Sequence, residues 1–89
     1  MALVLTLFKN QWCPSCKQVS PIIHQVAQQY PDKIKLEEVD IVAQPDLAAK
    51  NEILSVPTLI ISRDGQALDR ISGFISKDKL TDKINNYLK

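Results

Sequence analysis

The chain has 89 residues, enough for one small domain with its own core but not for two. Apolar residues make up 45% of it, and 11 basic residues nearly balance 10 acidic ones, for a net charge of +1. This composition excludes a disordered chain, and the even charge balance gives no electrostatic basis for binding nucleic acid or an anionic membrane. We therefore expect a single domain over residues 1–89, with neither nucleic acid nor membrane as a partner.

The apolar opening segment, residues 1–8, bears on where the protein acts. No basic segment precedes it and no small-residue cleavage site follows it, so we do not expect a signal peptide. Two cysteines are also too few for a disulfide-rich secreted scaffold. We expect a cytoplasmic monomer.

The first third of the chain predicts a strand followed by a long helix. Residues 3–8 are a near-continuous apolar run that suits a strand buried on both faces, and polar residues 9–11 end it. Over residues 13–30 the apolar positions recur every three or four residues, as in an amphipathic helix. Pro14 fits the first turn of this helix, whereas Pro21 lies inside it and should kink it.

The middle of the chain predicts a second strand over residues 34–39 and a short helix over about 46–51. The β-branched residues 58–62 predict a third strand, and residues 67–72 a fourth. Because the dipeptide Asp64-Gly65 separates these last two runs, they should form an antiparallel hairpin.

The end of the chain predicts a third helix. Gly73 ends the fourth strand, and Ser76 can cap a helix whose buried stripe is Leu80, Ile84, Tyr87 and Leu88. The order is then β-α-β-α-β-β-α, with the first two strands parallel through a right-handed crossover. The sequence therefore predicts an α/β fold in which three helices cover both faces of a four-stranded mixed sheet.

The two cysteines, Cys13 and Cys16, lie where the first strand gives way to the first helix. A helix N-terminus presents free N–H groups and the positive end of the helix dipole, which stabilise a thiolate. A spacing of three residues lets both sulfurs meet across one helical turn. We expect Cys13 to be the attacking nucleophile, facing solvent, and Cys16 to be the partly shielded resolving thiol that breaks the mixed disulfide.

Other interpretations of these residues are weaker. A zinc site needs four ligands, and the one histidine, His24, lies about 12 Å further along the same helix at roughly 1.5 Å per residue. We expect no metal site within one molecule and interpret His24 as an ordinary exposed side chain. A purely structural disulfide between Cys13 and Cys16 would close a loop of little entropic value. Trp12 is expected to be a half-exposed flap beside the sulfurs.

The segment Trp12–Lys17, Trp-Cys-Pro-Ser-Cys-Lys, resembles the active site of thioredoxins, whose usual form is Trp-Cys-Gly-Pro-Cys-Lys. Ser55–Thr58 resembles the cis-proline motif of that family, and Pro21, Asp40 and Gly73 match further positions. The resemblance covers nearly the whole chain. It implies a minimal thioredoxin-like fold and a thiol–disulfide oxidoreductase that reduces protein disulfides. It also implies a disulfide reductase, such as a thioredoxin reductase, as electron donor, and no cofactor.

The same resemblance assigns a substrate-binding surface. If the Val56–Pro57 bond is cis, the backbone of Val56 can pair with an extended substrate chain. Gly73 would let that chain approach closely. Trp12, Pro14 and Ser15 complete the expected substrate contacts.

The sequence departs from the thioredoxin pattern at several places. The N-terminal strand and helix of a full thioredoxin are missing, and Leu7 and Leu36 occupy the positions of its buried Asp and Lys. The proton of Cys16 must therefore leave by another route. A proline directly after the first cysteine, here Pro14, is typical of glutaredoxins, but the glutaredoxin Gly-Gly motif is absent around Gly73. Two alternatives stay open: a glutathione-linked glutaredoxin, and a non-catalytic module whose cysteines sense redox state or clip a metal between two chains.

Overall fold

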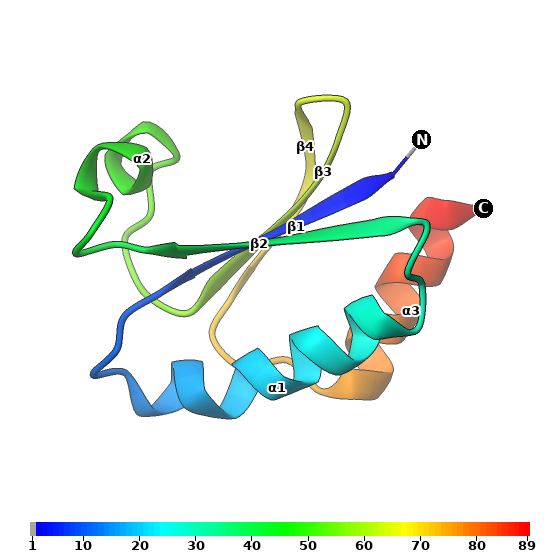
Figure 1. Ribbon diagram of the computed structural model, residues 1–89, viewed down its shortest axis with the longest axis horizontal. Coiled ribbons are helices and arrows are strands. Elements are labelled where there is room, and N and C mark those ends of the chain that lie inside the picture. Colours follow the sequence, from blue (N-terminus) through cyan, green and yellow to red (C-terminus); the bar gives the residue numbers. More distant parts are fainter. Residues whose placement is uncertain (1) are drawn as a thin grey trace.

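The computed structural model describes residues 2–89, and the four strands and three helices follow the predicted order (Figure 1). The strands form one sheet in the order β2-β1-β3-β4, in which β1 is parallel to β2 and antiparallel to β3, and β3 is antiparallel to β4. The α/β class and the mixed sheet are confirmed. The elements are β1 (Leu3–Lys9), α1 (Pro14–Gln28), β2 (Ile34–Asp40), α2 (Pro45–Lys50), β3 (Thr58–Arg63), β4 (Gln66–Ser72) and α3 (Lys77–Leu88).

The main core lies between the sheet and the two long helices, α1 and α3, which run along the same face of it (Figure 1). Alternate residues of β1 point into this core because side chains of a strand alternate between its two faces. The helices contribute the residues that recur at helical spacing. Fully buried members include Leu3, Leu5, Leu7, Ile23, Val26, Ile61, Leu80 and Ile84.

The opposite face of the sheet is covered at one end only. Phe8, Val39 and Ile60 form a small cluster there, close to the short helix α2. Farther along β1 on this face, Val4 and Thr6 are only half-buried. Helices thus lie on both faces as expected, but the prediction that β1 is buried on both faces is wrong for these two residues, because a six-residue helix cannot cover the whole strand.

The ends of two elements differ from the predictions. β1 continues through Lys9, which pairs in register with Asp40 of β2, although its polarity suggested that the strand had ended. Helix α1 ends at Gln28 rather than at Tyr30. The N–H groups of Gln29 and Tyr30 donate to carbonyls three residues back, so the last turn tightens before Pro31.

Local signals at the C-terminal half of the chain are confirmed. Asp64 and Gly65 have φ values of 54° and 80°, as a two-residue hairpin turn requires. Ser76 caps α3 by accepting a hydrogen bond from the Lys79 N–H at 3.3 Å. None of the helices within residues 2–89 is both long enough and apolar enough to cross a membrane.

Candidate active site

A short polar turn joins β1 to α1 and positions the first cysteine. The side-chain oxygen of Asn10 accepts a hydrogen bond from the Trp12 N–H at 2.8 Å, and its backbone oxygen accepts one from the Cys13 N–H at 3.2 Å. These two bonds reverse the chain at the end of the strand. Cys13 is therefore placed as the N-cap residue of α1, with Pro14 as the first residue of the helix.

The sulfur of Cys13 takes the place of the usual capping oxygen. It accepts a hydrogen bond from the Cys16 N–H at 3.2 Å, so a free helix N–H points directly at it. On its other side, Sγ lies 3.7 Å from the carbonyl oxygen of Val56, to which the thiol donates. Cys13 is half-buried, and both cysteines are free thiols. The sulfur thus lies at the helix terminus, as the sequence predicts, and it also faces the neighbouring loop.

Cys16 lies one turn further along α1 and is only 3% exposed. Burial and, after it, the hydrogen bond with Cys13 raise the pKa of its thiol from 9.0 to about 11. A backbone hydrogen bond from Asn10 and the positive charge of Lys9 act in the opposite direction. The Cys16 thiol is therefore protonated at neutral pH.

The loop before β3 faces the cysteine pair. The Val56–Pro57 peptide bond is cis, as the resemblance implied, and Pro57 is buried. The Gly73 N–H donates to the Pro57 carbonyl at 2.8 Å, and Thr58 Oγ1 donates to the Ser55 carbonyl at 2.7 Å. Gly73 has a φ of 83°, a value that favours glycine. The first bond ties the loop to the end of β4 and the second holds the loop together, while the Val56 carbonyl reaches Cys13.

Three of the predicted substrate contacts, Trp12, Pro14 and Ser15, lie exposed on the segment that carries the cysteines. Trp12 is 69% exposed, more than the half-exposed flap that the sequence suggested. Phe74, which sequence analysis overlooked, follows Gly73 directly and is 57% exposed. A large apolar side chain next to a strand-ending glycine was the signal that could have drawn attention to it.

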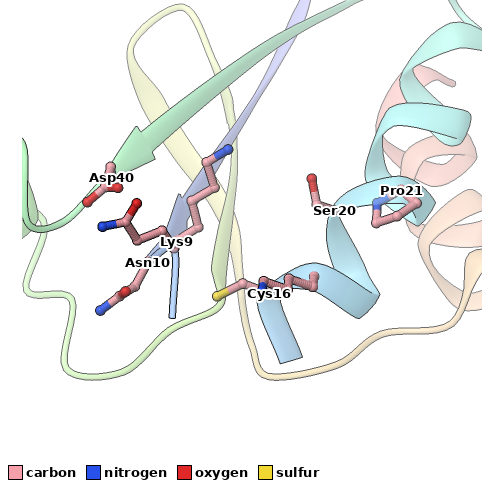
Figure 2. A pocket seen from close by; sticks show the side chains of 8 residues that line it. Lys9, Asn10, Cys16, Ser20, Pro21 and Asp40 are labelled. Atoms are coloured by element: carbon pink, nitrogen blue, oxygen red, sulfur yellow. The ribbon is translucent and has the colours of Figure 1, made fainter. Parts of the chain in front are cut away.

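Behind Cys16 the surface forms a hollow of about 470 Å³ (Figure 2). Lys9 from β1, Ser20 from α1 and Asp40 from β2 are among the residues that line it. Sequence analysis missed this hollow, because it treated Lys9 only as a strand breaker. A charged residue at the end of a buried strand, a few positions before the cysteines, was the available signal.

Next to this hollow, three polar side chains gather around one carboxylate. Glu38 of β2 accepts hydrogen bonds from Lys9 Nζ at 3.2 Å and from Ser20 Oγ at 3.3 Å, and it pairs with His24 Nε2 at 2.9 Å. Burial raises the pKa of Glu38, but hydrogen bonds from His24 and Lys9 outweigh it and hold that pKa below its usual range. The His24 side chain is 48% exposed, in agreement with its interpretation as an exposed residue.

The positions of the missing ionisable pair are apolar in the structure. Leu7 is fully buried in the main core, and Leu36 is half-buried against it. Within residues 2–89, no group of three or more histidine, cysteine, aspartate or glutamate side chains is placed to hold a metal ion.

The fold and this site together define a dithiol redox protein with a thioredoxin-like fold. One thiol is accessible at a helix N-terminus, the other is buried one turn away, and a cis-proline loop faces them. This arrangement suits thiol–disulfide exchange, in which an outer thiolate attacks and an inner thiol resolves.

Comparison with known proteins identifies the family. The family model described as Thioredoxin matches residues 1–86. Thioredoxins of Staphylococcus aureus, among them those of strains Mu50 and MW2, are 36% identical over 81 residues, which span 91% of this chain and 78% of theirs. The chain belongs to the thioredoxin family.

Solved structures agree with this assignment. Thioredoxin-2 of the malaria parasite, a component of that parasite's protein secretion machinery, superposes with a TM-score of 0.91 at 27% identity, over 96% of this chain and 82% of that one. A second malarial protein superposes with a TM-score of 0.92 at 27% identity over the full length of both chains.

The protein is therefore a thiol–disulfide oxidoreductase, and its relatives favour the thioredoxin interpretation over the glutaredoxin alternative. Membership of the family implies, in general terms, protein disulfides as substrates and a reductase as electron donor.

Proposed function

We propose that the protein reduces disulfide bonds of other proteins, with Cys13 as the nucleophile and Cys16 as the resolving thiol. The observation that carries this assignment is the difference between the two thiols. Cys13 caps the helix, accepts the Cys16 N–H and is partly accessible, whereas Cys16 is 3% exposed and is held protonated by its surroundings. A thiol that is accessible and receives a helix N–H is the one suited to attack.

The proposed reaction has two exchange steps. The Cys13 thiolate attacks one sulfur of the substrate disulfide, forms a mixed disulfide and releases the first substrate thiolate. Cys16 then loses its proton and attacks Cys13 Sγ, so that the Cys13–Cys16 bond forms and the second substrate thiolate leaves. Two electrons pass to the substrate, whose thiolates take up two protons, and the protein is left oxidised.

The proposed substrate-binding surface surrounds Cys13. Because the Val56 carbonyl lies 3.7 Å from the nucleophilic sulfur, a substrate strand that pairs with the backbone of Val56 would place its own cysteine next to Cys13. Pro57 and Gly73 form the adjoining wall, joined by their 2.8 Å hydrogen bond. Trp12, Pro14 and Ser15 offer further exposed contact area on the segment that carries the cysteines.

We further propose that residues 1–89 act as one domain, as a monomer in the cytoplasm, where cellular thiols are kept reduced. The electron donor would be a flavin-dependent disulfide reductase of the thioredoxin reductase type, and the protein itself would need no cofactor. The near-zero net charge, +1, supports partners other than nucleic acid or anionic membranes.

The test is reduction of insulin disulfides driven by dithiothreitol, with wild type, Cys13→Ser and Cys16→Ser compared side by side. We expect wild type to accelerate the reaction and both variants to lose this acceleration. Circular dichroism of each variant shows whether it is folded. No acceleration by a folded wild type would contradict a general protein-disulfide reductase.

Each cysteine variant is also the matched control for the other in a trapping experiment. Cys16→Ser retains the nucleophile, so we expect it to accumulate a dithiothreitol-sensitive mixed disulfide with insulin on a non-reducing gel. Cys13→Ser should form none, because its remaining thiol is buried. The opposite pattern would reverse the assigned roles.

A further inference from the structure

We propose that Lys9, held beside the hollow by Glu38, supplies the positive charge that stabilises the Cys16 thiolate in the resolving step, and that the hollow admits the water that takes the proton. The inference rests on the resolving role of Cys16 proposed above. It assigns to Lys9 a positioning role in the reaction, acting by charge through space.

The resolving step needs such help because Cys16 is an unreactive thiol in its resting state. Only 3% of it is exposed, and its pKa is raised to about 11 by burial and by its hydrogen bond with Cys13. Thiolate, and not thiol, attacks a disulfide. The positions from which a buried acid and base could act on Cys16 carry Leu7 and Leu36, whose side chains cannot exchange a proton.

The hollow offers a way to the thiol that does not pass through Cys13. Its volume of about 470 Å³ exceeds that of several water molecules, at about 30 Å³ each. Figure 2 shows Lys9 on one side, at the end of β1, and Ser20 and Pro21 on the other side, on α1, with Cys16 at the base of the helix. Water in this space would reach Cys16 without passing Cys13.

The charges around the hollow single out Lys9. Lys17 also lines it but is exposed, and the one acidic lining residue, Asp40, has an oxygen engaged with the Val42 and Ala43 N–H groups at 2.8 and 3.2 Å. The charge of Lys9 lowers the pKa of Cys16 and so favours the thiolate, although in the resting protein its effect is smaller than those of burial and of Cys13.

Glu38 keeps the ammonium group of Lys9 in place. Its Oε2 accepts from Lys9 Nζ at 3.2 Å, while its Oε1 is occupied by His24 at 2.9 Å and Ser20 at 3.3 Å. The carboxylate is thus fixed by residues of α1, and it fixes a lysine of β1 in turn. Because the Lys9 side chain is 35% exposed, its effect on Cys16 is only partly screened by solvent.

The proposed step is balanced as follows. Water in the hollow accepts the Cys16 proton and passes it to bulk solvent, and the new thiolate is stabilised by Lys9. The thiolate attacks Cys13 Sγ, the Cys13–Cys16 bond forms, and the bond from Cys13 to the substrate sulfur breaks. The substrate thiolate leaves with the electron pair and takes a proton from solvent.

The direct test is the titration of Cys16 in a Cys13→Ser background, followed by thiolate absorbance. This background mimics the mixed disulfide, in which Cys13 carries no charge. Lys9→Met should raise the titration midpoint by about 0.5 to 1 pH unit, whereas Lys9→Arg should leave it nearly unchanged. Lys17→Met is the matched control, because it removes an exposed charge from the same hollow. An unshifted midpoint in Lys9→Met, or an equal shift in Lys17→Met, would overturn the inference.

A kinetic test uses the otherwise wild-type protein. In a single turnover at pH 7, Lys9→Met should slow the release of the second substrate thiol about two- to fourfold, because the loss of thiolate is partly offset by its higher nucleophilicity. The first release, by Cys13, should change less, and the resolving rate should recover as the pH rises. Equal slowing of both releases at all pH values would indicate a structural role instead. Absence of any mixed disulfide in Cys16→Ser would instead refute the proposed function itself.

Discussion

The buried thiol of Cys16 should make the stability of the reduced protein depend on alkaline pH. Burial, followed by the hydrogen bond with Cys13, raises the pKa of this thiol from 9.0 to about 11 in the folded protein. The unfolded chain therefore loses the proton at lower pH than the folded protein does. Between these two values the unfolded state binds fewer protons, so stability falls as the pH rises.

The size of this effect follows from the shift. Two pH units correspond to about 3 kcal/mol, since one unit is worth about 1.4 kcal/mol. The stabilising contribution of the Cys16 proton is nearly complete below pH 9, and it is lost as the pH rises through 9 to 11 and somewhat beyond. A loss of this size is a large fraction of the stability of a small domain, which is typically about 5–15 kcal/mol.

Urea unfolding followed by circular dichroism, in a phosphine reductant at pH 8, 9, 10 and 11, measures this dependence. Cys16→Ser is the control, because it retains the other two groups whose pKa values are raised, Lys83 and Tyr87. The hydrogen bond with Asp69 is the main cause for Lys83, and burial is the main cause for Tyr87. The free energy of unfolding of wild type should fall by about 2 kcal/mol more than that of Cys16→Ser over this range, because half of the folded protein still carries the Cys16 proton at pH 11. Parallel curves for the two proteins would refute the argument that burial controls the Cys16 proton.

Three further predictions concern the fold around the site. Ile23→Ala should cost about 2–5 kcal/mol in urea unfolding, because Ile23 is fully buried, whereas the control Val42→Ala, at a side chain 59% exposed, should cost less than about 0.5 kcal/mol. Gly73→Ala should lower the free energy of unfolding by about 1–2 kcal/mol, because alanine rarely adopts the φ of 83° found at this position. An unchanged urea midpoint would mean that the turn relaxes freely. At low pH, wild type should lose more stability than Glu38→Gln. The lowered pKa of Glu38 contributes stability above pH 4.5 that is lost as the pH falls below it, so identical acid profiles would contradict the role of its bonds to Lys9 and His24.

The sequence by itself determined the class of fold and the position of the cysteine pair. Alternation and helical spacing are local patterns, and so are the turn at Asp64-Gly65 and the cap at Ser76, which is why they could be interpreted without the structure. The resemblance of Trp12–Lys17 and Ser55–Thr58 to thioredoxins further predicted a cis bond at Pro57 near Cys13, and the structure has both.

Tertiary structure alone decided how far the sheet is covered and what surrounds Cys16. The short α2 leaves Val4 and Thr6 half-buried, which no pattern within β1 could reveal. Lys9, Ser20 and Glu38 come from three separate elements and meet only because β1, β2 and α1 pack together. Interactions between such distant residues depend on packing geometry, whereas sequence patterns record local preferences. For this reason the sequence could show that the Cys16 proton lacks its usual route, but only the structure offers another.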